Sequence, residues 1–362
     1  MSHFSFFFTF LFSLFTCFIT FALFLLLNIM EITVIIPVKD QREHIGKTLD
    51  SILKSGIPPK EVIIVDNEST DGTYQFCEQY IKSRPNVTLL RETFPGAAAA
   101  RNKGLKSCKT EWVYFFDGDN HFDYNFMSTF GQIDAEAYDV VALPVKEKAN
   151  GKEFVRTFIP SEDPRVQLIA SAFTTPSLIF RTDYLRAIGE WDTACRTWED
   201  WELGIRLMLH QPRILWFTEK AFHTLTPRKE NNPEGSLSMH YKELIRTLAA
   251  VMTALHSSIL QPLSHYHSQH LSCLYPHLDL LIYPLYLRTN ILLGQLQREK
   301  MTGRCKKYKM ASKALTVFIG ENFTPTFSQR CIANWLRFCT MMGSTTAWKT
   351  ALRISLSKKA RK

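Results

Sequence analysis

The sequence predicts an α/β fold with a Rossmann-like, mostly parallel sheet covered by helices on both faces, followed by an α-helical C-terminal region. Short apolar, mainly β-branched runs alternate with segments of helical periodicity between residues 32 and 217. These runs are apolar throughout instead of alternating with polar residues, which is typical of parallel strands buried on both faces. Beyond about residue 230 only helical periodicity is left.

The first half of the chain contains four predicted strands, each followed by a turn or a helix. The strands are "ITVIIP" (32–37), "EVIIVDN" (61–67), "VTLLR" (87–91) and "WVYFFDG" (112–118). The helices are predicted over 43–55, 73–82 and the alanine-rich segment 97–107. Gly56 and the Pro58-Pro59 pair end the first helix because neither residue type continues a helix well.

The second half is less regular at first and then becomes helical. Residues 141–180 are expected to be an excursion that shapes a second binding site. A helix at 183–188 precedes "GEWD", another covers "TWEDWELGIRLMLH" (197–210), and "RILWF" (213–217) is a strand. One apolar stripe then predicts a long helix, formed by Tyr241, Leu244, Ile245, Leu248, Met252 and Leu255. The predicted domains are 30–228 and 229–362.

Composition excludes a disordered chain. Apolar residues make up 46% of the 362 residues, which is enough for a substantial core. The net charge of +9 is concentrated near the C-terminus, where residues 296–362 hold 15 Lys and Arg against two Glu. Because no recognition motif accompanies this basic tail, we expect a membrane surface or solvent to face it and no nucleic acid partner. The eight cysteines form no CxxC pair, which favours buried free thiols in a reducing compartment.

Residues 1–29 leave two interpretations open. The stretch from Phe4 to Leu27 has no charged residue and is long enough to cross a bilayer as a helix. Basic residues follow it, which would keep the remainder on the cytoplasmic side. However, Met30 opens "MEITVIIPVKD", a natural start for the first strand. The segment is therefore either a membrane anchor or dispensable upstream sequence, and the protein is expected in the cytoplasm, free or bound to the cytoplasmic membrane.

Acidic residues stand at or just beyond the ends of three predicted strands: Asp40, Asp66 and Asp117. In parallel sheets, ligands bind beyond these carboxyl ends. Asp117 and Asp119 are separated only by Gly118, so their carboxylates would lie roughly 4–6 Å apart and repel each other. A divalent cation such as Mg²⁺ or Mn²⁺ would remove the repulsion and could bridge to a diphosphate. The alternative is an ordinary turn, since Asp-Gly is a common turn dipeptide.

Taken together, six segments resemble the family-2 glycosyltransferases of GT-A fold. In order they are "VIIPVKD", "VDNESTDGT", "GAAAARNKGL", "FFDGDN", "GEWD" and "WEDWELGIRL", and the resemblance covers about residues 32–225. It implies an inverting, metal-assisted transfer of a sugar from a UDP- or GDP-sugar to an acceptor hydroxyl. A saccharide or lipid-linked acceptor in glycan or cell-surface polysaccharide synthesis would fit. The rival classes are a nucleotidyltransferase and a non-catalytic partner that binds sugar nucleotides.

On the donor side, the resemblance assigns Pro37, Val38 and Asp40 to the nucleobase pocket. Asp66 would accept hydrogen bonds from the base or the ribose. Asn67 stands where the family often has a second Asp, which leaves the identity of the nucleotide open.

The resemblance also implies a diphosphate and metal site. Arg101 and Asn102 match the "RN" element beside the donor, and Asp117 with Asp119 would hold the cation. His223 is expected either as a third metal ligand or as a diphosphate contact, although a lone histidine is often structural.

For the chemistry, the resemblance assigns Asp200 as the general base and places Glu199 beside it. An acceptor hydroxyl is a poor nucleophile until a base takes its proton. The alternative is that these acids only stabilise a helix start, which contributes about 0.3–1 kcal/mol. Similarly, Ser69, Thr70 and Asp71 would serve as helix caps whatever the function. We expect the donor to be held without help from the "WED" helix.

One further cluster is a weak candidate for a zinc site. It consists of His265, His267, His270, Cys273 and His277, which show no regular ligand spacing.

Overall fold

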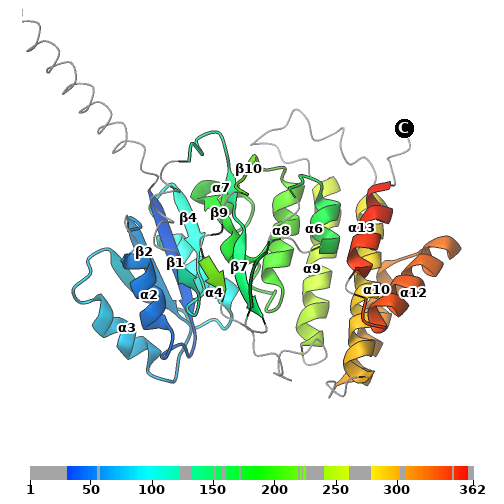
Figure 1. Ribbon diagram of the computed structural model, residues 1–362, viewed down its shortest axis with the longest axis horizontal. Helices are drawn as coiled ribbons and strands as arrows, with labels where there is room; N and C mark the ends of the chain where they lie inside the picture. Colours follow the sequence, from blue (N-terminus) through cyan, green and yellow to red (C-terminus); the bar gives the residue numbers. More distant parts are fainter. Residues whose placement is uncertain are drawn as a thin grey trace, which may run out of the picture.

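The computed structural model (Figure 1) describes residues 31–54, 58–122, 130, 133–149, 152–156, 160–170, 173–218, 221, 223–225, 240–260, 279–301, 307–344 and 346–357. The interpretations of residues 1–29 and of the His-rich tract at 265–277 lie outside these residues. Within them, no helix combines the length and the apolar character that crossing a bilayer requires.

The described strands form a seven-stranded sheet in the order β10-β6-β9-β4-β1-β2-β3. Its members are β1 (Ile32–Val38), β2 (Glu61–Asp66), β3 (Val87–Arg91), β4 (Trp112–Phe115), β6 (Val140–Ala142), β9 (Leu178–Arg181) and β10 (Ile214–Trp216). Strand β9 runs antiparallel to both of its neighbours, whereas the other pairs are parallel. The predicted mostly parallel sheet is confirmed.

The register of this sheet brings the predicted acids to one edge. Val38 lies beside Asp66 in the β1–β2 pair, and Ile35 lies beside Phe115 in the β1–β4 pair. The amide of Phe116 donates to the carbonyl of Ile35 at 2.9 Å, which carries the β4 pairing one residue further. Asp66 and Asp117 therefore emerge from neighbouring strand ends, as the sequence predicts.

Helices cover both faces of this sheet. One apolar cluster joins the strands to α2 (Ile45–Leu53) and α3 (Thr73–Ile81). The other joins them to α4 (Ala97–Ser107), α7 (Thr182–Ala187) and α8 (Glu199–Leu209). Helix α4 lies so close to β1 that a Cβ at Gly104 would be 2.5 Å from Cγ2 of Ile35. Glycine at this position lets the helix that carries Arg101 pack directly on the sheet.

A second, four-stranded sheet has the order β5-β11-β7-β8, and its strand β5 follows Asp119 closely in sequence. It contains β5 (His121–Phe122), β7 (Val145–Ala149), β8 (Lys152–Arg156) and β11 (His223–Leu225). Residues 141–180 are thus more regular than expected, since they also supply α6 (Pro164–Ala170), the 3₁₀ helix η1 (Thr175–Ser177) and β9.

The C-terminal region is helical, as predicted, and shares a core with the α/β part. Its described helices are α9 (Tyr241–Leu260), α10 (Asp279–Met301), α11 (Tyr308–Asn322), α12 (Phe327–Met341) and α13 (Ala347–Ser357). Figure 1 shows α6, α8 and α9 between the sheet and α10, α12 and α13. One apolar cluster joins Leu168 of α6 and Trp201 and Ile205 of α8 to Leu248 and Leu285. The boundary near residue 230 stays a prediction.

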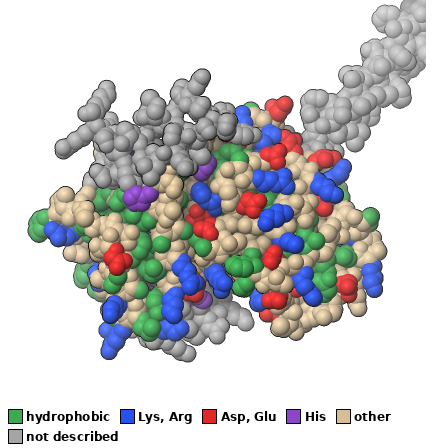
Figure 2. Space-filling view, turned by 180° about the vertical axis from the view of Figure 1, so that it is seen from behind, with side chains coloured by type: hydrophobic (Ala, Val, Ile, Leu, Met, Phe, Trp, Pro, Cys, Tyr) green, Lys and Arg blue, Asp and Glu red, His purple; other side chains and the backbone are tan. Residues whose placement is uncertain are grey.

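The described surface and cysteines can be compared with the expected charge and thiols. Charged side chains of both signs are interspersed on the face shown in Figure 2, so the basic excess forms no continuous patch there. Cys77, Cys108 and Cys195 are buried free thiols, as expected. Cys331 is exposed, which corrects the expectation that the thiols are buried; it lies on an exposed position of α12.

Candidate active site

The loops that follow β1 and β2 are tied together by side chains. The carboxylate of Asp40 accepts a hydrogen bond from the Thr70 amide at 2.7 Å, and the Asp40 amide donates to the Ser69 hydroxyl at 3.0 Å. The amide of Arg42 donates to Asp71 at 3.0 Å. These residues therefore join two loops, whereas the residue that precedes α3 is Gly72, which makes no side-chain cap. The predicted capping role is wrong for Ser69 and Thr70, because Asp40 engages both.

Asp66 presents an unsatisfied carboxylate oxygen at the end of β2. Its side chain is fully buried, its Oδ2 accepts from the Ser69 amide at 3.2 Å, and its Oδ1 has no hydrogen-bond partner among the described residues. Buried polar atoms are normally hydrogen-bonded, so an orphaned acceptor calls for a donor from a ligand. Pro37 and Val38 form the adjacent end of β1, with Val38 buried beside Asp66.

Asn67 holds the loop that leads into α4. Its side-chain amide donates to the carbonyls of Glu92 and Phe94 at 2.9 and 2.8 Å, and its Oδ1 accepts from the Gly96 amide at 2.8 Å. An aspartate could not make both donations, because an ionised carboxylate only accepts. Asn67 is therefore bound to the protein itself at the position where the resemblance left the nucleotide open.

Asp117 and Asp119 lie on a short loop whose backbone is held by a side chain of α2. The Thr48 hydroxyl lies within hydrogen-bond distance of the carbonyls of Gly118 and Asn120, at 3.0 and 2.9 Å. A Cβ at Gly118 would lie 3.0 Å from a methyl of Val38, so the loop fits tightly against β1. Burial, and next the negative charge of Asp117, raise the pKa of Asp119. The predicted repulsion between the two carboxylates is thus present.

Arg101 connects this loop to the start of α8. Its guanidinium binds Asp117 at 3.2 Å and Glu199 at 3.0 Å, and it lies over the Trp191 ring, 4.5 Å from the centroid. The side chain is only 5% exposed. Burial by itself would lower the pKa of Arg101, but the carboxylates of Asp117 and Glu199 outweigh it and raise that pKa. The cation is therefore held as a charged bridge.

This bridge corrects the expectation that the donor side is independent of the "WED" helix. Glu199 and Asp200 form the first turn of α8, and Glu199 reaches Arg101 across 98 positions of sequence. Asp200 is partly buried, and its Oδ1 accepts from the Trp201 amide at 2.8 Å. Because Arg101 holds both Asp117 and Glu199, the strand edge and the proposed base belong to one site.

The residue that precedes these acids has an unusual backbone. Trp198 has φ of 60° and ψ of 31°, the left-handed region that a bulky residue rarely adopts. Its ring packs edge-on against Trp201 with the centroids 5.7 Å apart. The Thr247 hydroxyl of α9 donates to the carbonyl of Thr197 at 2.6 Å. Thus the C-terminal region helps to fix the start of α8.

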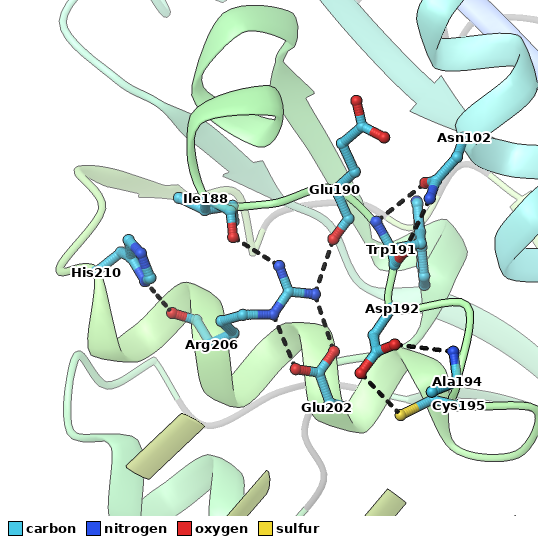
Figure 3. A network of polar contacts seen from close by, with 10 residues as sticks. All are labelled: Asn102, Ile188, Glu190, Trp191, Asp192, Ala194, Cys195, Glu202, Arg206 and His210. Carbon is cyan, nitrogen blue, oxygen red and sulfur yellow. Dashed lines mark hydrogen bonds and ion pairs between the residues drawn. The ribbon is translucent and has the colours of Figure 1, made fainter. Parts of the chain in front are cut away.

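The segment "GEWD" is anchored by a buried ion pair within α8 (Figure 3). Arg206 binds both carboxylate oxygens of Glu202 at 2.8 and 2.9 Å. Its Nη1 donates to the carbonyl of Ile188, and its Nη2, which also binds Glu202, donates to the carbonyl of Glu190, each at 2.7 Å. Glu202 is only 3% exposed, so the pair is closed off from solvent. Sequence reasoning missed this role, although an arginine four residues after a glutamate on a helix was a usable signal.

The same segment is held from the other side by α4. Asn102 forms two hydrogen bonds with the backbone of Trp191, donating at 2.8 Å and accepting at 3.0 Å. The Trp191 ring in turn lies under Arg101. The two residues of the "RN" element therefore have separate roles. Arg101 binds the two carboxylates, and Asn102 holds Trp191, whose ring packs against Arg101.

The backbone pairing of β11 places His223 next to the strand that follows Asp117 and Asp119. Strand β11 pairs antiparallel with β5, so that His223 lies opposite Phe122, shortly after Asp119. Its side chain is outside the described part of the chain. Among the side chains that are described, no group of three or more His, Cys, Asp and Glu is arranged to hold a metal ion.

Comparison with known proteins identifies sequence relatives of this domain. The glycosyl transferase family 2 model matches residues 33–186. The chain is 28% identical over 164 residues to a poly(ribitol-phosphate) β-glucosyltransferase of Bacillus spizizenii, covering 43% of this chain and 26% of that protein. It is 27% identical over 208 residues to the poly(ribitol-phosphate) β-N-acetylglucosaminyltransferase TarS of Staphylococcus aureus, covering 56% and 36%. The chain thus spans about a quarter to a third of these relatives.

Solved structures share the fold over most of the chain. TarS residues 1–349 from S. aureus, in complex with UDP-GlcNAc, matches with a TM-score of 0.61 and 19% identity, covering 92% of this chain and 93% of that one. A further S. aureus TarS structure gives a TM-score of 0.57 and 20% identity, covering 90% and 55%. At these low sequence identities the structural similarity establishes the fold alone. The predicted GT-A fold followed by a helical region is confirmed.

The buried pair beneath this site gives a test of its architecture. Replacing Arg206 with methionine leaves Glu202 as an uncompensated buried charge, so the free energy of unfolding should fall by about 3–5 kcal/mol. The Glu202→Gln/Arg206→Met double variant should recover a large part of that loss. Urea denaturation of the three proteins measures both quantities, and a single variant as stable as the parent would contradict the role assigned to the pair.

Proposed function

Residues 33–186 form a domain of glycosyl transferase family 2, and on this basis we propose that the protein is an inverting glycosyltransferase. It transfers a sugar from a nucleoside-diphosphate sugar to a hydroxyl of a saccharide polymer or lipid-linked acceptor. The observation that carries the proposal is the Arg101 bridge, because it joins the strand edge at Asp117 to Glu199, the residue before Asp200. A binding site for the leaving diphosphate and a base for the acceptor hydroxyl are thereby fixed to one buried cation.

The donor binds at the carboxyl ends of β1, β2 and β4. The orphaned Oδ1 of Asp66 accepts from the base or the ribose, since it is buried and lacks a partner in the described part of the chain. Pro37, Val38 and Asp40 line the nucleobase side of the same edge. The TarS structure that shares this fold holds UDP-GlcNAc, which makes a UDP-linked sugar the first donor to test.

The transfer itself needs one proton acceptor. Asp200 takes the proton of the acceptor hydroxyl as its oxygen forms a bond to the anomeric carbon. The bond from that carbon to the diphosphate oxygen breaks on the opposite side, and the nucleoside diphosphate leaves with the electron pair. Attack from the face opposite the leaving group inverts the configuration at the anomeric carbon.

The residues present suit a divalent cation. Asp117 and Asp119 are close enough for their repulsion, together with burial, to raise the pKa of Asp119. Oxygen ligands of this kind are those that Mg²⁺ and Mn²⁺ prefer. We assign Asp117 and Asp119 as its ligands, with His223 as the third candidate because its strand adjoins β5. When bound, the cation would neutralise charge on the departing diphosphate.

The relatives supply the cellular context of the proposal. The proteins named above act on poly(ribitol-phosphate), and another relative, 26% identical over 197 residues, is the minor teichoic acid biosynthesis protein GgaA of Bacillus subtilis. We accordingly place this protein in the synthesis of a cell-surface polysaccharide.

The base assignment predicts that turnover and donor binding respond differently to Asp200→Asn. Loss of general-base catalysis should reduce kcat by about 10²–10⁴-fold. Donor affinity, measured by calorimetry with Mg²⁺ or Mn²⁺ present, should change by less than about tenfold, or 1.4 kcal/mol. The amide is nearly isosteric with the carboxylate, so the helix start should keep its shape.

Asp183→Asn is the matched control, because Asp183 is an exposed acid in the first turn of α7. It should leave turnover unchanged. Normal turnover in Asp200→Asn would transfer the role to Glu199 or another group. A joint loss of donor binding and thermal stability would show that the acid is structural.

The metal assignment predicts opposite effects of Asp119→Asn on stability and activity. Without metal, the variant should have a higher Tm at neutral pH, because it removes an ionised carboxyl whose folded-state pKa is raised. The difference should vanish as the pH falls toward 3.8, the ordinary pKa, where the parent carboxyl is protonated as well. The variant should also transfer sugar poorly, as should the parent protein in EDTA. Full transfer by metal-free parent protein in chelator would refute the assignment.

A further inference from the structure

In the part of the chain that the structure describes, Arg288 of α10 is a cation without a counter-charge. Its Nε is buried and has no hydrogen-bond partner, and no carboxylate of the described residues forms an ion pair with it. Desolvation alone shifts its pKa, lowering it to about 10. The residue as a whole is only partly buried, so its side chain is not completely closed off from solvent.

An unpaired arginine in such a place is unusual. A guanidinium carries five N–H donors and stays charged at neutral pH, so folded proteins normally pair it with carboxylates or carbonyls. Burying a charge without a partner destabilises the fold. Arg101 and Arg206 of this chain follow the rule, since each binds carboxylates at about hydrogen-bond distance. Within the described residues Arg288 departs from it, which points to a ligand as its partner.

The position of Arg288 indicates whether the donor or the acceptor supplies its partner. Its guanidinium carbon lies 5.1 Å from the centroid of the Trp198 ring. Trp198 directly precedes Glu199 and Asp200 and has the left-handed backbone described above. Packing against Trp201 and the bond from Thr247 to the preceding carbonyl keep this tryptophan in place. Arg288 is thus part of the wall next to the proposed base.

The donor diphosphate does not account for this charge. Its proposed site lies at the strand ends, where Arg101 is the nearby cation, and α10 belongs to the C-terminal region. The group that must come close to Asp200 is the acceptor hydroxyl. An anion bound by Arg288 would therefore belong to the acceptor.

We propose that Arg288, seated on Trp198, binds an anionic group of the acceptor, either a phosphate or a carboxylate, and so selects an acidic polymer over a neutral one. This rests on the proposed glycosyl transfer. A planar guanidinium suits both groups, because its fork of donors matches two oxygens. In this role Arg288 binds substrate and takes no part in the proton transfer.

A binding experiment tests Arg288 without any transfer reaction. The full-length protein, Arg288→Gln and the control Arg353→Gln are heated in rising concentrations of inorganic phosphate and, separately, of acetate, at ionic strength matched with chloride. Arg353 is an exposed arginine of α13, so the control loses the same charge. The parent and the control should gain Tm with at least one of the two anions, and Arg288→Gln should lose that gain.

The variant itself discriminates a ligand-binding arginine from a structural one. Because Arg288 has no partner in the described fold, Arg288→Gln should be as stable as the parent in chloride, or more stable. A lower Tm together with an unchanged anion effect would overturn the proposal. An anion effect that is equal in all three proteins, or absent from all three, would overturn it as well.

Kinetics with matched acceptors identify the anionic group. The acceptors are a phosphodiester-linked polyol oligomer, an oligosaccharide that contains uronic acid, and a neutral oligosaccharide of the same length. The parent should prefer one of the two acidic acceptors. In Arg288→Gln the KM for that acceptor should be at least tenfold higher, and the KM for the donor should be unchanged. A neutral acceptor that works as well as both acidic ones in the parent would refute the inference. If no acceptor is glycosylated, the proposed function fails, and the phosphate and acetate titrations still decide on Arg288.

Discussion

The site depends on one buried cation with two carboxylate partners. The guanidinium of Arg101 is almost fully enclosed, which would be unfavourable without compensation. Asp117 from the end of β4 and Glu199 from the start of α8 supply that compensation, and Trp191 supplies a ring below it. Because the two carboxylates come from elements far apart in sequence, their shared cation fixes how the sheet and α8 sit relative to each other. Removal of Arg101 would leave the two carboxylates without their shared cation.

This constraint explains why so much of the chain converges on α8. Arg206 and Glu202 hold the "GEWD" segment from within the helix, and Asn102 holds it from α4. The C-terminal helices bury Trp201 and Ile205 and bind the backbone before Trp198 through Thr247. The helical region is therefore part of the site's framework, and in our proposal it also provides the acceptor contact through Arg288. Acceptor selection would then lie in the region of the chain that carries none of the recognised motifs.

Sequence reasoning succeeded where the signal is local. Apolar runs predict buried strands, and parallel pairing brings the residues at their carboxyl ends to one edge of the sheet. Asp66 and Asp117 could therefore be placed together. It failed where a side chain finds its partner through the fold. Nothing local marks Glu199 as a partner of Arg101, or Asn67 as a clamp on the loop before α4. The antiparallel β9 was hidden because its pairing, and not its composition, gives its direction. Arg288 looked like any helical arginine, since only its surroundings make it unusual.

The central claim is that Arg101 couples the donor edge to α8, and a double-mutant cycle in donor affinity tests it most directly. UDP-sugar binding is measured by calorimetry for the parent, Arg101→Met, Glu199→Gln and the double variant. The Glu199→Gln substitution would weaken donor binding only through its effect on Arg101. The double variant should therefore bind the donor about as well as Arg101→Met alone, with a coupling energy of about 0.5–3 kcal/mol. Effects of the two substitutions that simply add would show that Glu199 and Arg101 act separately, and the account of a single bridged site would be wrong.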